Sequence, residues 1–144
     1  MPQTTHCASV TAAGIPVRIA ARVIDVLILV VIDGALGRAI GFGFDWLFMA
    51  AAIVITYFVV LDVFAGTTAG KAVFGLHVTA ADGRRLSAKQ ALIRESFILL
   101  GAVPFAGPLL AAAGWVWILL TMRSSPLRQG KHDQLAGGTL VVHG

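Results

Sequence analysis

The stretch from residue 16 to residue 40 constrains the fold most, because it is long enough to cross a bilayer and yet contains charges. It reads PVRIAARVIDVLILVVIDGALGRAI. A membrane-spanning helix needs about 20 mostly apolar residues, and counting from Pro16 places Asp25 roughly 13 Å deep in a hydrocarbon layer of about 30 Å. An ionised carboxylate at the centre costs about 2.5–3.5 kcal/mol, so Asp25 needs a partner or water inside a bundle.

Two arginines precede this aspartate on the same helix. Arg22 lies three residues before Asp25 on one helical face, and Arg18 lies two turns before it. Two interpretations stay open. The cluster is either a structural anchor, in which the arginines extend toward the head groups and Arg22 or a proton neutralises Asp25, or a site for transport or signalling.

Composition places the chain in a membrane. Hydrophobic residues make up 58% of it, charged residues 12%, and the mean hydropathy is +0.87, which is too apolar for an ordinary soluble domain. The net charge of +4 comes from basic residues beside the apolar runs, without the aromatic-interleaved patch of a nucleic-acid binder. A single cysteine, Cys7, provides neither a disulfide nor a metal site. We therefore expect a lipid bilayer as partner, and no nucleic acid, metal or cofactor.

We predict a flexible cytoplasmic tail over residues 1–15 and a single membrane domain over 16–142. Its first helix, 16–40, is expected to remain uncleaved, because acidic residues interrupt the apolar run and a clear cleavage site is missing. The second helix spans 44–64, with Trp46 as an interfacial anchor. Asp62, in its last turn, can reach the membrane face from which the two arginines enter.

A polar insert follows over residues 65–87. Its GTTAGK sequence contains Gly66, Thr68, Gly70 and Lys71, but three residues separate the glycines and Ala72 follows the lysine, so it is not a phosphate-binding Walker loop. Residues 77–81, the Asp82-Gly83 pair and residues 84–86 predict a β-hairpin. Ser87 and Gln90 then predict a capping box that starts a helix.

The segment from 88 to 122 allows either one long span or two short helices. Pro104 and Pro108 permit a reversal, which would give helices at 88–103 and 109–122. Basic residues at the N-terminus, in the insert and after residue 122 should all be cytoplasmic, which requires an even number of crossings. We predict an all-α integral membrane protein with four transmembrane helices, three being the runner-up, and both termini cytoplasmic.

The C-terminal residues complete the expected cap. A strand over 139–142 should pair with the hairpin, at the strand of residues 77–81, and form a small cytoplasmic sheet. His132 and Asp133 could suggest acid–base chemistry, but no nucleophile or metal-ligand partner lies at a useful spacing. We interpret them as a structural hydrogen-bonded pair.

Together these pieces resemble the RDD family of bacterial membrane proteins, over residues 14–142. The matching segments are RIAARVID (18–25), GTTAGKAVFGLHVTAADGRRLS (66–87), ALIR (91–94) and KHDQLAGGTLVV (131–142). The resemblance implies that Arg18, Asp25 and Asp133 are the arginine and two aspartates of the family name, and that Gly75, Asp82 and Gly83 also belong to its loop motif. Ala69 stands where the family commonly has proline.

We therefore expect a non-enzymatic protein of the bacterial inner membrane. Arg18, Arg22, Asp25, Asp62, Arg94 and Asp133 should all project toward the cytoplasmic half. We favour an accessory or assembly subunit of a larger membrane complex, such as a transport system, with a membrane-protein partner or a second copy of the chain. The alternative, which the resemblance also implies, is a cation/proton antiporter in which Asp25 alternates between a proton and a monovalent cation.

Overall fold

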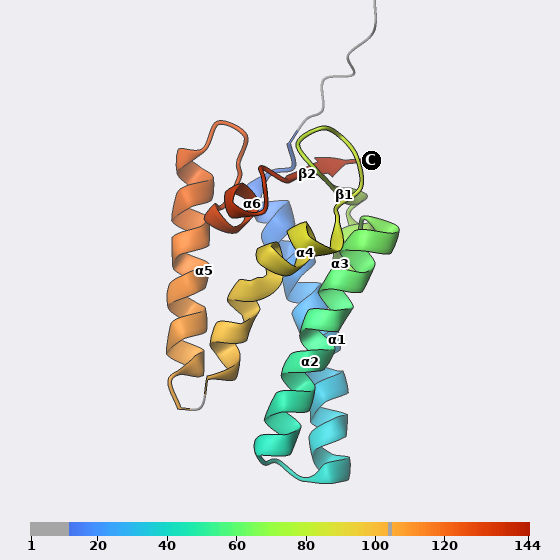
Figure 1. The fold of residues 1–144 in the computed structure, drawn as a ribbon, viewed down its shortest axis with the longest axis vertical. Coiled ribbons are helices and arrows are strands. Elements are labelled where there is room, and N and C mark those ends of the chain that lie inside the picture. Colours follow the sequence, from blue (N-terminus) through green and yellow to red (C-terminus); the bar gives the residue numbers. More distant parts are fainter. Residues whose placement is uncertain (1–11, 104) are drawn as a thin grey trace, which may run out of the picture.

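The computed structural model describes residues 12–103 and 105–144 and is mostly helical (Figure 1). The predictions for residues 1–11, for Cys7 and for Pro104 lie outside this part. The helices and strands, in chain order, are α1 (Ile15–Ile40), α2 (Phe44–Val60), the π-helical turn η1 (Leu61–Ala65), α3 (Ala69–Val73), β1 (Leu76–Thr79), α4 (Ala88–Glu95), the 3₁₀-helix η2 (Ser96–Ala102), α5 (Gly107–Ser124), α6 (Lys131–Leu135) and β2 (Leu140–His143).

Two helical arms extend from a compact cap. One arm is the antiparallel pair α1 and α2, and the other is the antiparallel pair η2 and α5, while α3, α6 and the sheet lie together at the top of the view (Figure 1). Pro16 lies in the first turn of α1, as predicted, and Gly41 ends the helix with a φ of 87°, a conformation that glycine adopts without strain. Within the described residues, one helix, Phe44–Ala65, is long and apolar enough to cross a membrane.

The segment from 88 to 124 forms two helices rather than one, because the chain reverses between η2 and α5 (Figure 1). The first differs from the prediction. It begins as an α-helix with the expected capping box of Ser87 and Gln90, but from Ser96 it continues as a 3₁₀-helix. A 3₁₀-helix rises about 2.0 Å per residue, so these few residues reach further than an α-helix of the same length. Pro108 lies in the first turn of α5.

The sheet has two strands, not the predicted three. The pairing of β1 with the C-terminal strand is confirmed: it is antiparallel, with Val78 opposite Val141. The predicted hairpin is wrong. Asp82 and Arg84 form hydrogen bonds within a local turn, and residues 84–86 do not pair with β1 as a second strand. The Ala80 amide donates to the Arg84 carbonyl at 2.8 Å, and the Asp82 carboxylate accepts from both the amide and the Nε of Arg84.

The apolar core of the cap lies between the sheet, α1 and α4. It contains Ala13, Ala21, Leu76, Val78, Leu86, Ala91 and Val141. Ala12 forms a β-bridge with Val142, and the Ala13 amide donates to the Val141 carbonyl at 2.8 Å. Both ends of the described chain therefore lie at the same end of the molecule.

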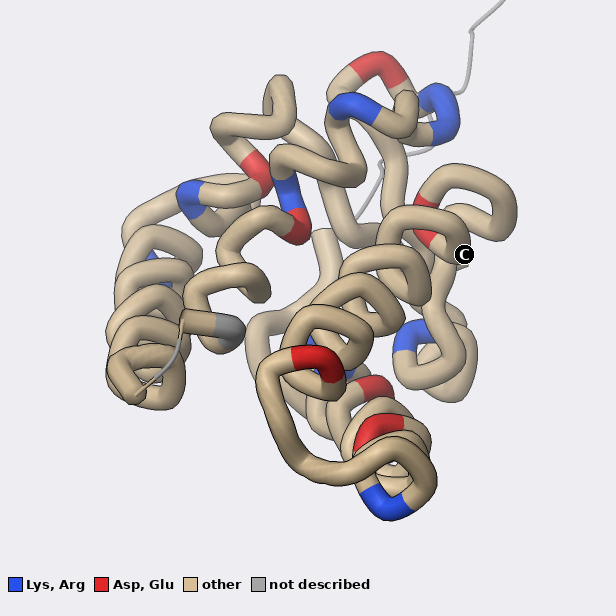
Figure 2. Tube along the Cα trace, turned by 60° about the horizontal axis from the view of Figure 1, so that its bottom comes forward, with Lys and Arg blue, Asp and Glu red and all other residues tan. Residues whose placement is uncertain are grey.

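Charge is distributed unequally along the molecule. Figure 2 shows the charged residues as short bands separated by long uncharged stretches. The cap end carries six basic residues and one acidic residue outside the interior, a net charge of +5: Arg84, Arg85, Lys89, Arg123, Arg128, Lys131 and Asp82. The opposite end, formed by the end of α1 and the start of α2, carries Asp33, Arg38 and Asp45, a net charge of −1. The remaining charged residues lie in the interior.

Candidate functional site

The interior contains a charge-balanced cluster at the junction of the arms and the cap. Four basic and four acidic side chains meet there, from α1, η1, α3, α4 and α6: Arg18, Arg22, Lys71, Arg94, Asp25, Asp62, Glu95 and Asp133. All six residues predicted to project toward one half of the membrane are included. Lys71 was predicted only as part of the loop motif, and Glu95 was missed.

Asp133 connects the two ends of the domain. Its Oδ2 lies 2.7 Å from Nη2 of Arg18, and its Oδ1 lies 3.2 Å from Nε of Arg94 and accepts from the Thr139 hydroxyl at 3.1 Å. Burial alone would raise the pKa of Asp133, but the positive charges of Arg94 and Arg18 outweigh it and keep that pKa well below its usual range. Two members of the implied family triad, Arg18 and Asp133, are thus a direct ion pair.

Arg22 pairs with Glu95, not with Asp25. Its Nη2 lies 2.5 Å from Oε2 of Glu95, and its guanidinium lies 3.9 Å from the ring centre of Phe58 and 5.3 Å from that of Trp115. The prediction that Arg22 neutralises Asp25 is therefore wrong. The charge-assisted hydrogen bond to Glu95 and the two aromatic rings orient the guanidinium of Arg22 away from Asp25.

Asp25 is fully buried and is satisfied by neutral donors. Oδ1 accepts from the Tyr57 hydroxyl and the Gly70 amide, both at 2.8 Å, and Oδ2 accepts from the Thr68 hydroxyl at 2.5 Å. Thr68 is also the N-cap of α3, which it stabilises by accepting from the Lys71 amide. The loop motif therefore docks on the helix through the carboxylate at the centre of α1.

Gly70 is required by this close approach. A Cβ at position 70 would clash with the Ala21 carbonyl and lie 3.0 Å from the Asp25 carboxyl carbon. Two other motif glycines, Gly66 and Gly75, have positive φ angles of 68° and 61°. Asp82 and Gly83 lie in the exposed turn after β1, and the structure does not bring them to the cluster.

Lys71 and Asp62 form the third ion pair, with 2.6 Å between Nζ and Oδ1. Arg94 lies on the other carboxylate oxygen of Asp62, at 3.6 Å. Asp62 was predicted to reach the face of Arg18 and Arg22; it lies in the same cluster but pairs with other cations. Burial lowers the pKa of Lys71, and the neighbouring Asp62 opposes this shift.

His132 is buried beside Asp133, but the hydrogen bond predicted between them does not form. The Nε2 atom lies 3.5 Å from Oδ1 of Asp133, and Nδ1 has no hydrogen-bond partner among the described residues. Burial lowers the pKa of His132 to about 4, although Asp133 opposes the shift, so the imidazole is neutral at pH 7. In the described part of the chain, no three His, Cys, Asp or Glu residues gather in a group that could hold a metal ion.

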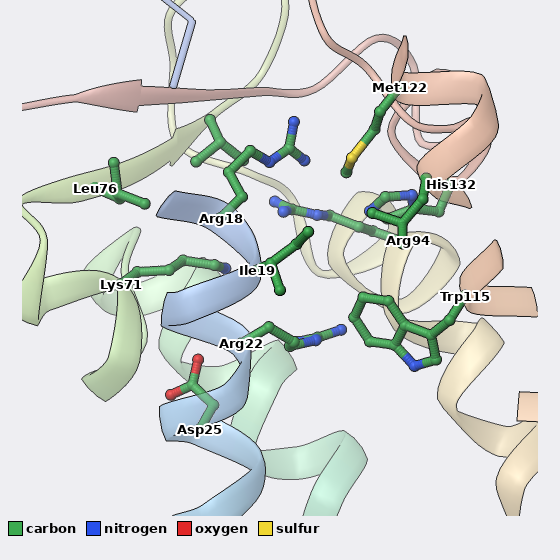
Figure 3. A pocket seen from close by; sticks show the side chains of 12 residues that line it. Arg18, Ile19, Arg22, Asp25, Lys71, Leu76, Arg94, Trp115, Met122 and His132 are labelled. Atoms are coloured by element: carbon green, nitrogen blue, oxygen red, sulfur yellow. The ribbon is translucent and has the colours of Figure 1, made fainter. Parts of the chain in front are cut away.

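A cavity of about 50 Å³ lies beside the cluster, between α1 and α5 (Figure 3). Its charged lining consists of Arg18, Arg22, Lys71, Arg94 and Asp25. Apolar side chains from α1, α5 and both strands, together with His132 of α6, complete the wall. A few water molecules or one small polar group would fit this space, since a water needs about 10–15 Å³ by the same measure.

Comparison with known proteins gave one family. The family model described as RDD family matches residues 12–137, which includes both helical arms and most of the cap. Neither a comparison with curated proteins nor one with solved structures gave a match.

Proposed function

The chain belongs to the RDD family, and from that premise we propose that it is a non-enzymatic, multi-pass membrane protein that serves as an accessory or assembly subunit of a larger membrane complex. The state of Asp25 carries this proposal. Its carboxylate accepts three hydrogen bonds from Tyr57, Thr68 and Gly70. A carboxylate with these partners stabilises the docking of a loop on a helix, which is a structural task.

The alternative function is cation/proton antiport. One observation favours it, because Asp25 also lines the cavity. The rest of the lining opposes it, since four basic side chains face the same space and would repel a cation that approaches the carboxylate. We therefore place the assembly role first.

The proposed topology is four crossings of the inner membrane with both termini in the cytoplasm. The two ends of the described chain lie together, as the bridge between Ala12 and Val142 requires. The end that they share carries the net charge of +5, as expected for a cytoplasmic face. Helix α5 has 18 residues. At 1.5 Å per residue it extends about 27 Å, close to the hydrocarbon thickness of about 30 Å.

The outer faces of the arms supply the surface for lipid and for a partner. Large apolar side chains are exposed along both arms, including Val31, Phe48 and Leu109, each more than 70% exposed. In the most apolar window of the Phe44–Ala65 helix, only 17% is buried within the chain. Such a surface is stable only against acyl chains or against the helices of another membrane protein or a second copy.

The test combines purification with transport. A tagged chain is solubilised from its native membranes in a mild detergent, and copurifying subunits are identified by mass spectrometry. We expect a membrane-protein partner at fixed stoichiometry, and no cation-dependent proton flux when the chain alone is placed in liposomes. A chain that purifies alone and exchanges cations for protons would overturn the proposal. Asp25→Asn should then abolish the flux, and Asp45→Asn, an exposed control, should keep it.

A further inference from the structure

The cavity between α1 and α5 has a strongly unequal lining. Arg18, Arg22, Lys71 and Arg94 line it, whereas among the described residues Asp25 is the only acidic one that does. The other three carboxylates of the cluster, Asp62, Glu95 and Asp133, do not line the cavity. The cluster as a whole is neutral, but the charge facing the cavity is +3. A space of this kind attracts an anion.

Buried donors without partners point to the same conclusion. The side chain of Arg94 is only 4% exposed, yet its Nε and Nη1 atoms have no hydrogen-bond partner among the described residues. The Nε atom lies 3.2 Å from Oδ1 of Asp133, an ion-pair distance without hydrogen-bond alignment. Figure 3 shows the side chains of Arg18, Arg22, Arg94 and His132 around one space. The Nη1 atom lies 3.6 Å from Oδ2 of Asp62, and Nε also lies 3.8 Å from Oε1 of Glu95, so carboxylates balance the charge of Arg94 while these two donors remain without an aligned acceptor.

The mouth of the cavity opens on the apolar side of the molecule. Two of its lining residues are partly exposed, Ile19 at 40% and Trp115 at 37%, and Arg22 retains 17% exposure of its side chain. The surface beside this mouth is apolar, with Val23 and Val116 both more than half exposed. A ligand that enters here approaches along hydrocarbon-like surface and meets positive charge inside.

We infer that this cavity binds the phosphate group of an anionic phospholipid, whose acyl chains lie along the groove between α1 and α5. The phosphate oxygens would accept from Arg94 and Arg22, since guanidinium groups match oxyanions in geometry and charge. The cavity is well placed for a lipid head group, because it lies at the cap end. In the proposed topology, the first turns of α1 and the last turns of α5 lie in the head-group region. The apolar mouth favours a lipid over free phosphate as the source of the oxyanion. The inference requires membrane insertion but not the proposed role as a subunit.

The test measures thermal stability in detergent with three probes: phosphatidylglycerol, phosphatidylcholine and inorganic phosphate. We expect phosphatidylglycerol alone to raise Tm, saturably and by about 5 °C or more, because a ligand that binds only the folded state stabilises it. Equal shifts with phosphatidylcholine would show a general lipid effect and overturn the inference. If inorganic phosphate raised Tm as much as phosphatidylglycerol does, the ligand would be free phosphate and not a lipid.

Two pairs of variants test the location without altering any charge. Ile19→Trp and Leu119→Trp fill the mouth from α1 and from α5, and each should reduce the shift caused by phosphatidylglycerol to less than half. Their matched controls, Val31→Trp and Leu109→Trp, lie on the same helices but at least ten residues from Ile19 and Leu119, outside the cavity lining, and should retain the full shift. A full shift in both mouth variants would show that the lipid binds elsewhere.

Discussion

Asp25 is fully buried within α1, and its three hydrogen-bond donors determine its role. Two of them, Thr68 and Gly70, belong to the loop motif, and Tyr57 comes from α2. The carboxylate therefore links α1, α2 and α3 at one point. Its removal should affect assembly of the domain before it affects any transport.

We expect Asp25→Asn to lower the free energy of unfolding by about 1–3 kcal/mol, because an amide presents one donor group where the carboxylate presents only acceptors. Thermal unfolding in detergent measures this change. Asp45→Asn is the matched control, and as an exposed residue in the first turn of α2 it should cost less than about 1 kcal/mol. An Asp25→Asn protein as stable as the wild type would contradict the structural role.

His132 makes stability depend on pH. Its pKa is about 4 in the folded protein, lowered by burial from an ordinary value of 6.5. Between these values the unfolded chain binds a proton and the folded chain does not, so stability decreases as pH falls from 6.5 toward 4. The slope is at most about 1.4 kcal/mol per pH unit. Asp133, whose folded pKa is also lowered, contributes a loss only below about pH 4.

His132→Gln should therefore flatten the dependence of Tm on pH between 6.5 and 4. His77→Gln, on the exposed side of β1, is the matched control and should leave that dependence unchanged. The measurement is a series of melting curves in detergent across this range. An unchanged slope in His132→Gln would assign the pH dependence to other groups.

At the scale of elements, α3 is short and depends on its docking. A helix of five residues is not stable alone, and α3 forms because Thr68 caps it and α1 lies against its first turn. The sheet follows the same rule, since β1 pairs with a strand more than 60 positions away in the chain and not with its neighbour. Long-range contacts thus decide both elements.

Gly70→Ala should destabilise the protein by about 1–3 kcal/mol, because the added methyl group separates α3 from α1. Gly34→Ala is the control within α1. No atom lies within 4 Å of a Cβ built there, so it should be neutral or stabilise by up to about 1 kcal/mol through helix propensity. Equal melting temperatures for the two variants would show that α3 does not pack as described.

At the scale of the whole molecule, the proximity of the two chain ends determines how the protein can cross a bilayer. The bridge at Ala12 and the strand that ends at His143 lie on one side, and both helix reversals lie on the other. The number of crossings is therefore even if the arms span the membrane. Under the proposed topology, the positive-inside rule places the end with the net charge of +5 in the cytoplasm.

We expect reporter fusions after Gly144 and within residues 103–107 to report opposite sides of the membrane, with the C-terminal fusion cytoplasmic. Arg38→Ala should keep this orientation, since it removes the basic residue in the last turn of α1, at the end opposite the cap. Adding several lysines at residues 42–45 should disturb it. A C-terminal reporter on the outer side would exclude the four-crossing topology.

Features that depend on local chemistry could be predicted from the sequence. The proline at the start of α1, the capping box before α4 and the reversal before α5 follow from residues within a few positions of one another. The sequence also predicted that six charged residues lie in one half of the domain, because the position of a residue along a helix gives its distance from the end of that helix. Glu95 was missed, although its position just before the uncharged run from Phe97 to Met122 indicates the edge of a span.

The pairing of the charges could not be predicted in this way, because it depends on contacts between segments far apart in the chain. Arg22 lies three residues from Asp25 but pairs with Glu95, which is 73 positions away, and Arg18 pairs with Asp133 at a separation of 115. Local spacing brings side chains within reach of one another, but a buried ion pair forms where the geometry and the remaining hydrogen bonds are best. Those conditions exist only after the arms and the cap have packed. The same packing leaves a cavity beside this neutral cluster, and most of the charged side chains that line the cavity are basic.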